Sequence, residues 1–190
     1  IMDIAKKFNS KSIITSKKNK NGTERIYEAY KKIKKKYDLI IDIQGDEPLI
    51  NPVHIDNVVE FHKKNKSIDI ILPHIKIKYG DNHNIVKLLT DIKDNVIYLS
   101  RAKLPLEFKQ INKSYKKHLS IISFKPDALK KFYSSKRTPL EKSEDIELLR
   151  ALEIGLKIKT LPLRGDSFSI DILDDYKKAI EKFKIDKIQK

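Results

Sequence analysis

Short apolar runs alternate with amphipathic stretches along this 190-residue chain. The apolar runs predict strands, which occupy residues 12–15, 37–43, 68–77, 84–92, 96–99, 118–124 and 157–163. The amphipathic stretches predict helices, which occupy residues 23–36, 51–64, 126–133, 140–155 and 173–184. Ile26, Ala29, Tyr30 and Ile33 show the helical spacing in the first of these stretches. The run at 37–43 is almost continuously apolar, as expected for a strand buried on both faces.

Strands and helices at this spacing predict βαβ units, and therefore an α/β fold with a three-layer, mostly parallel sheet. The runs at 84–92 and 96–99 flank the turn Lys93-Asp94-Asn95 and predict a hairpin. This hairpin and the irregular, polar stretch that follows it predict a small β-rich excursion from the main sheet. The chain shows no repeat, linker or domain boundary, so residues 1–190 predict a single domain.

The composition and charge of the chain exclude several classes of function. The net charge of +15 suggests nucleic acid, yet only 5 of the 41 basic residues are Arg, the residue that phosphate and base recognition favours. We therefore interpret lysine pairs such as Lys116-Lys117 as solvated faces, and expect no nucleic-acid partner. The absence of Cys excludes disulfides, zinc–thiolate sites and thiol catalysis. No apolar run approaches the roughly 18–20 residues of a membrane span, so we expect a cytoplasmic protein without a membrane partner.

Two carboxylates follow predicted strands at positions where α/β sheets bind ligands. Asp46 follows the buried strand, and Asp171 precedes the last helix. Carboxylates on separate loops suit a hard cation such as Mg²⁺, whose other ligands are water and substrate phosphate. Two simpler interpretations remain open, because Asp46 is also a common turn residue and Asp171 a common helix cap.

Several motifs, in this order, resemble one known family. Residues 41–50 (I-D-I-Q-G-D-E-P-L-I) resemble the signature of 3-deoxy-manno-octulosonate cytidylyltransferases, the CMP-Kdo synthetases. Further matching segments extend over nearly the whole chain: 21–25 (N-G-T-E-R), 82–87 (N-H-N-I-V-K), 98–105 (Y-L-S-R-A-K-L-P), 118–121 (H-L-S-I), 139–141 (P-L-E) with Glu147, Leu149 and Arg150, and 169–171 (S-I-D). Each match alone is weak, whereas their common order is specific.

The resemblance implies a fold of the nucleotide-diphospho-sugar transferase type and an enzyme that joins CTP to a 3-deoxy-2-keto sugar acid. In it, Asp46 and Asp171 would be catalytic and would hold Mg²⁺, because phosphoryl-type transfer depends on charge neutralisation. The nucleotide would be bound by Gln44, Gly45, Gly22, Thr23 and Arg25. The sugar acid would be bound by Arg101, His118, Glu147 and Arg150, which can pair with its carboxylate and hydroxyl groups.

The sequence also departs from the family. The family's opening βα unit with its phosphate loop has no counterpart before Ile1, so we expect an N-terminally truncated chain that does not turn over CTP by itself. Ile122 and Leu148 replace polar residues of the family's sugar pocket, which favours a different sugar pattern. The resemblance implies a homodimer, with residues 94–118 as its expected contact. The alternatives are a cytidylyltransferase for another sugar acid, such as an acylneuraminate, and a non-catalytic basic remnant.

Overall fold

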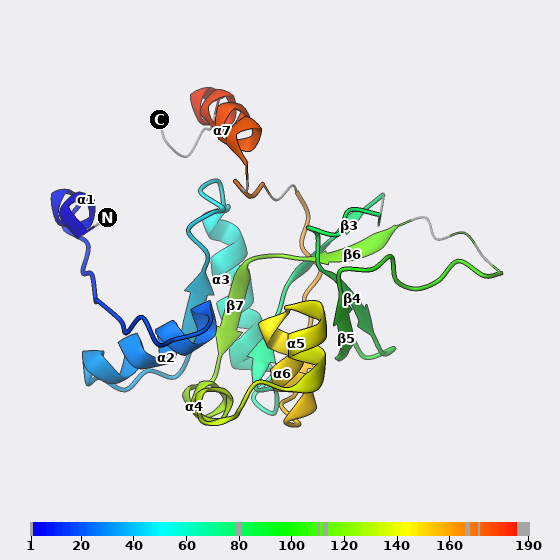
Figure 1. Cartoon of the computed structure of the whole chain (residues 1–190), viewed down its shortest axis with the longest axis horizontal. Coiled ribbons are helices and arrows are strands. Elements are labelled where there is room, and N and C mark those ends of the chain that lie inside the picture. Colours follow the sequence, from blue (N-terminus) through cyan, green and yellow to red (C-terminus); the bar gives the residue numbers. More distant parts are fainter. Residues whose placement is uncertain are drawn as a thin grey trace.

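The computed structural model describes residues 2–78, 81–109, 111, 114–165, 168–170 and 172–185 (Figure 1). Its helices are α1 (Met2–Lys7), α2 (Gly22–Ile33), α3 (Pro52–Lys64), α4 (Pro126–Ser134), α5 (Pro139–Glu144), α6 (Glu147–Glu153) and α7 (Leu173–Ile185). Its strands are β1 (Ile40–Ile43), β2 (Ile70–Ile71), β3 (His74–Ile77), β4 (Lys87–Thr90), β5 (Val96–Ser100), β6 (Tyr115–His118), β7 (Ile121–Phe124) and β8 (Ile158–Lys159).

The first sheet has the strand order β1-β7-β2-β8 and lies between two helical layers. Strands β1, β2 and β8 run in one direction and β7 runs against its two neighbours, so the sheet is mixed. Alternate residues of β7 point to opposite faces. Phe124 belongs to the core shared with α2, α4 and α6, and Ile121 packs with Val58 of α3 on the other face. The expected three-layer α/β fold is confirmed, with β7 as its antiparallel strand.

The second sheet has the order β3-β6-β4-β5, and its strand pairs are antiparallel. The predicted hairpin is present as β4 and β5, with a register shift between Leu89 and Thr90. The predicted β-rich excursion is thus part of a second four-stranded sheet, which is larger than the small excursion that the sequence predicts.

Two predicted strands are each divided between the two sheets. The run at 68–77 forms β2 in the first sheet and β3 in the second, with Leu72-Pro73 between them. The run at 118–124 likewise divides into the end of β6 and β7 at Leu119-Ser120. The two bends are joined, because the Leu119 amide donates to the Pro73 carbonyl at 2.9 Å. The predictions of single strands were wrong for both runs, because the chain changes sheet at each bend. In the first run, Pro73 also cannot donate a ladder hydrogen bond.

Two further predictions differ from the structure. The helix predicted at 140–155 is two helices, α5 and α6, separated at Asp145, whose φ of 51° lies in the left-handed region. The strand predicted at 12–15 is absent, and this segment instead lies beside α2. There Glu28 accepts from the Ser16 amide at 3.0 Å, and Lys32 Nζ donates to the Ile14 carbonyl at 2.7 Å. These side-chain contacts take the place of a ladder with a neighbouring strand.

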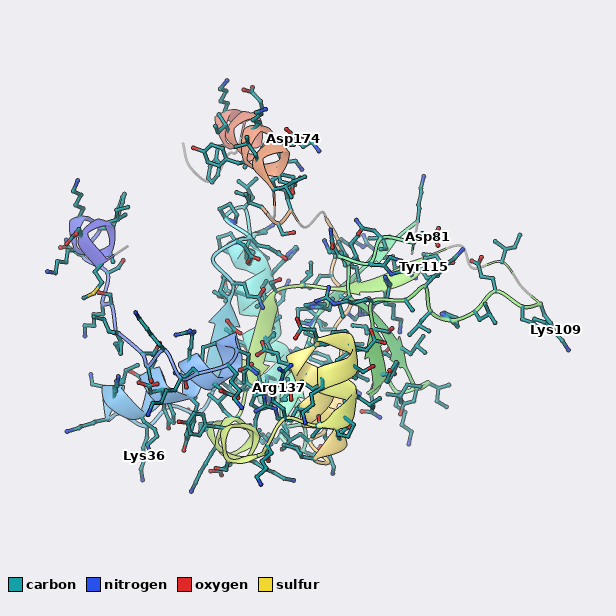
Figure 2. All side chains as sticks on the ribbon, viewed as in Figure 1. Lys36, Asp81, Lys109, Tyr115, Arg137 and Asp174 are labelled. Carbon is teal, nitrogen blue, oxygen red and sulfur yellow. The ribbon has the colours of Figure 1, made fainter. Side chains whose placement is uncertain are left out.

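Lysine side chains extend from the periphery of the molecule. Figure 2 shows Lys36 and Lys109 at its outer edge, in agreement with the interpretation of most lysines as solvated. Helices α1 and α7 lie away from the two sheets in Figure 1. In the part of the chain that the structure describes, no helix combines the length and apolarity needed to cross a membrane.

Candidate active site

A cleft of about 820 Å³ opens where the two sheets meet. Its wall comes from the start of α2, the turn after β1, the segment before β4, the end of β6 and the break between α5 and α6. The predicted residues Gly22, Gln44, Asp46, Arg101, His118 and Glu147 line it. Residues far apart in the sequence therefore meet at one place, as the resemblance implies.

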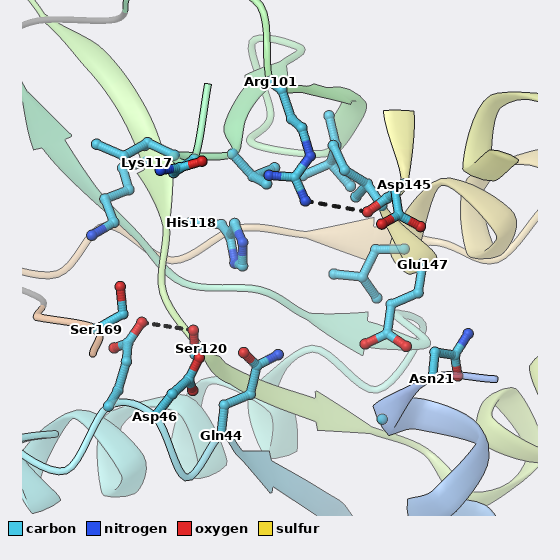
Figure 3. A pocket seen from close by; sticks show the side chains of 18 of the residues that line it. Asn21, Gln44, Asp46, Arg101, Lys117, His118, Ser120, Asp145, Glu147 and Ser169 are labelled. Carbon is cyan, nitrogen blue, oxygen red and sulfur yellow. Dashed lines mark hydrogen bonds between the residues drawn. The ribbon is translucent and has the colours of Figure 1, made fainter. Parts of the chain in front are cut away.

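The turn after β1 forms one end of the cleft. Gln44 continues from β1, and its amide donates to the Ser120 carbonyl at 3.3 Å. The exposed Asp46 follows it, and the buried Glu47 accepts a 2.7 Å hydrogen bond from Ser120 Oγ (Figure 3). The turn is thus tied to the β6–β7 bend by both backbone and side chain. Gly45, which sequence analysis assigns to the nucleotide, does not line the cleft.

Carboxylates concentrate at this end of the cleft. Asp42 lies on β1 with only 7 % of its surface exposed. Its burial, with the negative charges of Glu147 and Asp46, raises its pKa to about 7. Burial also raises the pKa of Glu147. These carboxyl groups repel one another in their charged forms, so the site favours a positive ligand.

The N-terminus of α2 is in direct contact with Glu147 at the wall of the cleft. Asn21 caps this helix, because its Oδ1 accepts from the Glu24 amide at 2.9 Å. The backbone amide of Thr23, in the first turn of this helix, donates to Glu147 Oε2 at 3.2 Å. Thr23 itself is fully buried behind the cleft wall. It therefore holds Glu147 in place, and Asn21 and Gly22 are the residues of this segment that reach the cavity.

The opposite end of the cleft carries cations. Figure 3 shows His118 between Arg101 and Ser120, with Lys117 on the same side. His118 is half-buried, and desolvation lowers its pKa even though Nδ1 lies 3.3 Å from the Leu119 carbonyl. Lys117 lines the cleft and is not part of a solvated face, so that interpretation was wrong for this residue. Its position directly before His118 was the signal in the sequence.

Two predicted arginines lie outside the cavity. The exposed Arg25 donates to Thr15 Oγ1 and to the Ser16 carbonyl, both at 3.2 Å, and so fixes the segment before α2. Arg150 is fully buried on α6, and sequence analysis assigns it to the sugar. This placement does not match that assignment, because the Arg150 side chain is enclosed by other protein groups.

Arg150 is the centre of a buried ion cluster. Its guanidinium donates to both oxygens of Glu141, at 2.6 and 2.7 Å, and to Glu24 Oε1 at 3.0 Å. It also lies over the Phe132 ring, 4.2 Å from the centroid. Arg137, labelled in Figure 2, adds a 3.2 Å ion pair to Glu141. The cluster joins α2, α5 and α6, and so holds the two helical walls of the cleft together.

Asp171, the second predicted metal ligand, lies outside the described residues. The described residues on either side of it, Ser169, Ile170 and Ile172, come close to the Asp46 turn. Ser169 and Ile172 line the cleft, and the Ile170 amide donates to the Asp46 carbonyl at 2.9 Å.

The chemistry of the donors at this end fits Mg²⁺, which prefers carboxylate oxygens and is commonly held by one or two of them besides water and phosphate. Asp46 offers such an oxygen at the cavity surface. Among the described residues, no group of three or more His, Cys, Asp or Glu side chains is arranged to enclose an ion. The arrangement therefore suits a cation that reaches the site with a phosphorylated ligand.

The chain is similar to known proteins over most of its length. The family model described as cytidylyltransferase matches residues 1–158. A 3-deoxy-manno-octulosonate cytidylyltransferase of Fusobacterium nucleatum is 38% identical over 185 residues, which cover 96% of this chain and 75% of the relative. The mitochondrial enzyme of that name from Arabidopsis thaliana is 36% identical over 94% of this chain and 63% of its own length.

Solved structures share the fold. A CMP:2-keto-3-deoxy-manno-octonic acid synthetase complexed with CTP superposes with a TM-score of 0.88 and 22% identity, over 96% of this chain and 77% of the other. HddC from Yersinia pseudotuberculosis, complexed with GMP-PN, superposes with a TM-score of 0.63 and 16% identity, over 96% of this chain and 72% of the other.

Proposed function

Because this chain belongs to the cytidylyltransferase family, and within it to the 3-deoxy-manno-octulosonate cytidylyltransferases, we propose that it activates Kdo with CTP. The anomeric hydroxyl of the sugar acid attacks the α-phosphorus of CTP, and pyrophosphate leaves as CMP-Kdo forms. The product would serve lipopolysaccharide biosynthesis. The observation that carries this proposal is a single cleft with Asp46 at one end and Lys117, His118 and Arg101 at the other, where Asp145 lies beside Arg101.

The carboxylate end suits the reacting phosphates. Asp46 and Asp171 would hold Mg²⁺, which neutralises phosphate charge and lowers the pKa of the attacking hydroxyl when bound. Gln44 and Asn21 project amide groups into the cleft, and these can donate to or accept from the cytosine or the ribose. Glu147, fixed by the Thr23 amide, lies beside Asn21 and accepts hydrogen bonds from sugar hydroxyls.

The cationic end suits the sugar acid. His118 contributes a ring that faces the cavity, and Arg101 and Lys117 add positive charge beside it. The buried side chains of Ile122 and Leu148 form an apolar part of the same wall. These two residues bear on sugar preference, because an apolar wall leaves a sugar hydroxyl without a partner. Kdo and an acylneuraminate are therefore to be compared directly.

We further propose a cytoplasmic homodimer with residues 94–118 at its contact. Large apolar side chains support this: Ile97 is 57% exposed, Leu106 81% and Phe108 84%. Exposed apolar side chains in one region are typical of protein interfaces. Sedimentation of the chain and of a Leu106→Ser, Phe108→Ser variant tests the proposal, which predicts a dimer for the first and a monomer for the second.

Pyrophosphate release tests the activity. The chain, extended at its N-terminus by the family's opening βα unit with its phosphate loop, is incubated with CTP, Mg²⁺ and either Kdo or N-acetylneuraminate, and we expect release with Kdo and at least tenfold less with the other acid. The 190 residues alone should not turn over CTP. Arg25→Met is the control variant. It should release pyrophosphate as fast as the unaltered protein, because Arg25 lies outside the cleft. Absence of release with both acids, together with absence of CTP binding, would refute the proposed function.

A further inference from the structure

Lys87 is a buried cation beside the cleft. It begins β4 and has no exposed surface, although lysine is rarely buried without a partner of opposite charge. Its Nζ donates to the Asn82 carbonyl at 2.9 Å and to the Arg101 carbonyl. No carboxylate of the described residues is in ion-pair contact with this ammonium group. Desolvation accordingly lowers the pKa of Lys87, and Glu144 opposes this from a distance.

Arg101 donates further hydrogen bonds to backbone carbonyls in the same region. Its Nε donates to the Glu144 carbonyl at 3.0 Å, Nη1 to the His83 carbonyl at 3.2 Å and Nη2 to the Asp145 carbonyl at 3.3 Å. Figure 3 shows the last of these at the rim of the cleft. Lys87 and Arg101 thus tie three cleft segments together through backbone carbonyls. The carbonyls satisfy these donors without neutralising either positive charge.

The charges therefore differ between the two ends of the cleft. Asp46 and Glu147 line one end, and Asp42 is buried behind it, so that end attracts a cation. At the other end, the carboxylates near Lys87 and Arg101 are Glu144, Asp81 and Asp145. Asp81 pairs with Lys103 at 3.9 Å and Asp145 with Arg137 at 3.3 Å, and Glu144 is bonded to Ser100 Oγ at 2.6 Å and to the Arg101 amide at 3.0 Å. Because Lys103 and Arg137 already pair with Asp81 and Asp145, Lys87 and Arg101 together with these two cations outnumber the three carboxylates and leave an excess of positive charge. Such an excess is favourable once an anion occupies the cavity.

We propose that Lys87 is a positioning residue that makes this end of the cleft selective for the carboxylate of the sugar acid. This inference rests on the proposed function. Lys87 does not line the cavity, so it acts through the carbonyls that it holds and through its charge. A neutral sugar gains nothing from that charge. Discrimination between acid and neutral sugar therefore depends on a residue that touches neither.

The experiment compares the binding of Kdo and of its neutral methyl ester by calorimetry. Lys87→Met removes the charge at nearly equal volume. Lys116→Met is the matched control, because it removes one cation from the adjacent strand β6, where Lys116 Nζ contacts Thr90 Oγ1 at 2.6 Å outside the cleft. We expect the acid-to-ester affinity ratio to fall about tenfold, or about 1.4 kcal/mol, in Lys87→Met alone. The Kd of CTP should change less than twofold in both variants.

An unchanged ratio in Lys87→Met, or an equal fall in Lys116→Met, would overturn the inference. If Lys87→Met does not fold by circular dichroism, Lys87→Arg replaces it. That variant keeps the charge with a different donor geometry, so Kdo should bind more weakly with the ratio retained, and a lost ratio would refute the role of the charge. If the unaltered chain binds neither Kdo nor the ester, the proposed function itself fails, which is a distinct result.

Discussion

The backbone amide of Ile170 donates a hydrogen bond to the carbonyl oxygen of Asp46 at 2.9 Å. This contact joins the segment that leads to Asp171 to the turn after β1, and it supports a shared role for the two carboxylates. We predict that Asp46→Asn and Asp171→Asn each reduce pyrophosphate release more than about 100-fold, because a hard cation bound by carboxylates provides several kcal/mol of charge stabilisation. For Asp46→Asn the free energy of unfolding should stay within about 0.5 kcal/mol, since Asp46 is exposed.

Asp174→Asn is the matched control for these variants. Asp174 lies on α7 with 70% of its side chain exposed, and it pairs with Lys177 at 3.4 Å. It should keep the activity of the unaltered chain. Full activity in either Asp46→Asn or Asp171→Asn would contradict the metal assignment.

Asp42 makes the stability depend on pH. Folding raises its pKa from 3.8 to about 7, so the native state holds the proton more tightly than the unfolded chain. The stability that this group contributes is complete below pH 3.8 and is lost as the pH rises through 7. Asp42→Asn should therefore raise the free energy of unfolding at pH 8 by a few kcal/mol at most, on the order of 1.4 kcal/mol for each unit of pKa difference. Urea unfolding at pH 5 and pH 8 measures this, and a variant that is no more stable at pH 8 would contradict it.

The ion cluster around Arg150 stabilises the fold, and substitutions within it measure this contribution. Arg150→Met should cost about 3–5 kcal/mol, because it leaves the buried carboxylate of Glu141 without its partner. Adding Glu141→Gln removes the unpaired charge, so the double variant should recover part of the loss. Urea unfolding of the unaltered chain, of Arg150→Met, of Glu141→Gln and of the double variant measures the coupling. If the two substitutions cost the sum of their separate effects, the two side chains do not act as a pair.

A buried histidine produces the opposite pH dependence. His74 is 2% exposed, and its Nδ1 lies 2.7 Å from Thr160 Oγ1, which itself donates to the Leu72 carbonyl. Burial lowers the pKa of His74 from 6.5 to about 4. Its contribution to stability is complete above pH 6.5 and is lost as the pH falls towards 4, by up to about 1.4 kcal/mol per pH unit.

His74→Asn keeps a donor near the position of Nδ1 and removes this titration. The fall in the free energy of unfolding between pH 6.5 and pH 4 should therefore be smaller in this variant. The exposed His83→Asn variant, with the same change of side chain, is the control. An identical slope in His74→Asn and His83→Asn would show that His74 does not titrate as described.

Local patterns predicted most elements of the fold. The helical spacing of Ile26, Ala29, Tyr30 and Ile33 located α2, and the motif at 41–50 located the turn that carries Gln44 and Asp46. Such predictions succeed because amphipathic spacing and capping act over a few residues. The common order of the motifs also predicted that residues far apart in the sequence share one site, which no local pattern could show.

The misses share a physical cause, which is contact between distant segments. The division of 68–77 and 118–124 between two sheets depends on the hydrogen bond from Leu119 to Pro73, and an apolar run does not reveal it. The break at Asp145 is stabilised by Arg101, which lies 44 residues away. Arg150 belongs to a motif that sequence analysis assigns to the sugar, yet its partners Glu141 and Glu24 are inside the protein. A motif identifies residues that matter without distinguishing a ligand contact from a support.

The bend between β6 and β7 has an evolutionary consequence. Within four successive residues the chain passes from Lys117 and His118, at the cationic end, to Ser120, whose carbonyl and hydroxyl hold the turn at the other end. The spacing between the two halves of the cleft is thus set by chain length alone. A single insertion or deletion here would shift one half against the other. Functional relatives should therefore keep this bend free of gaps.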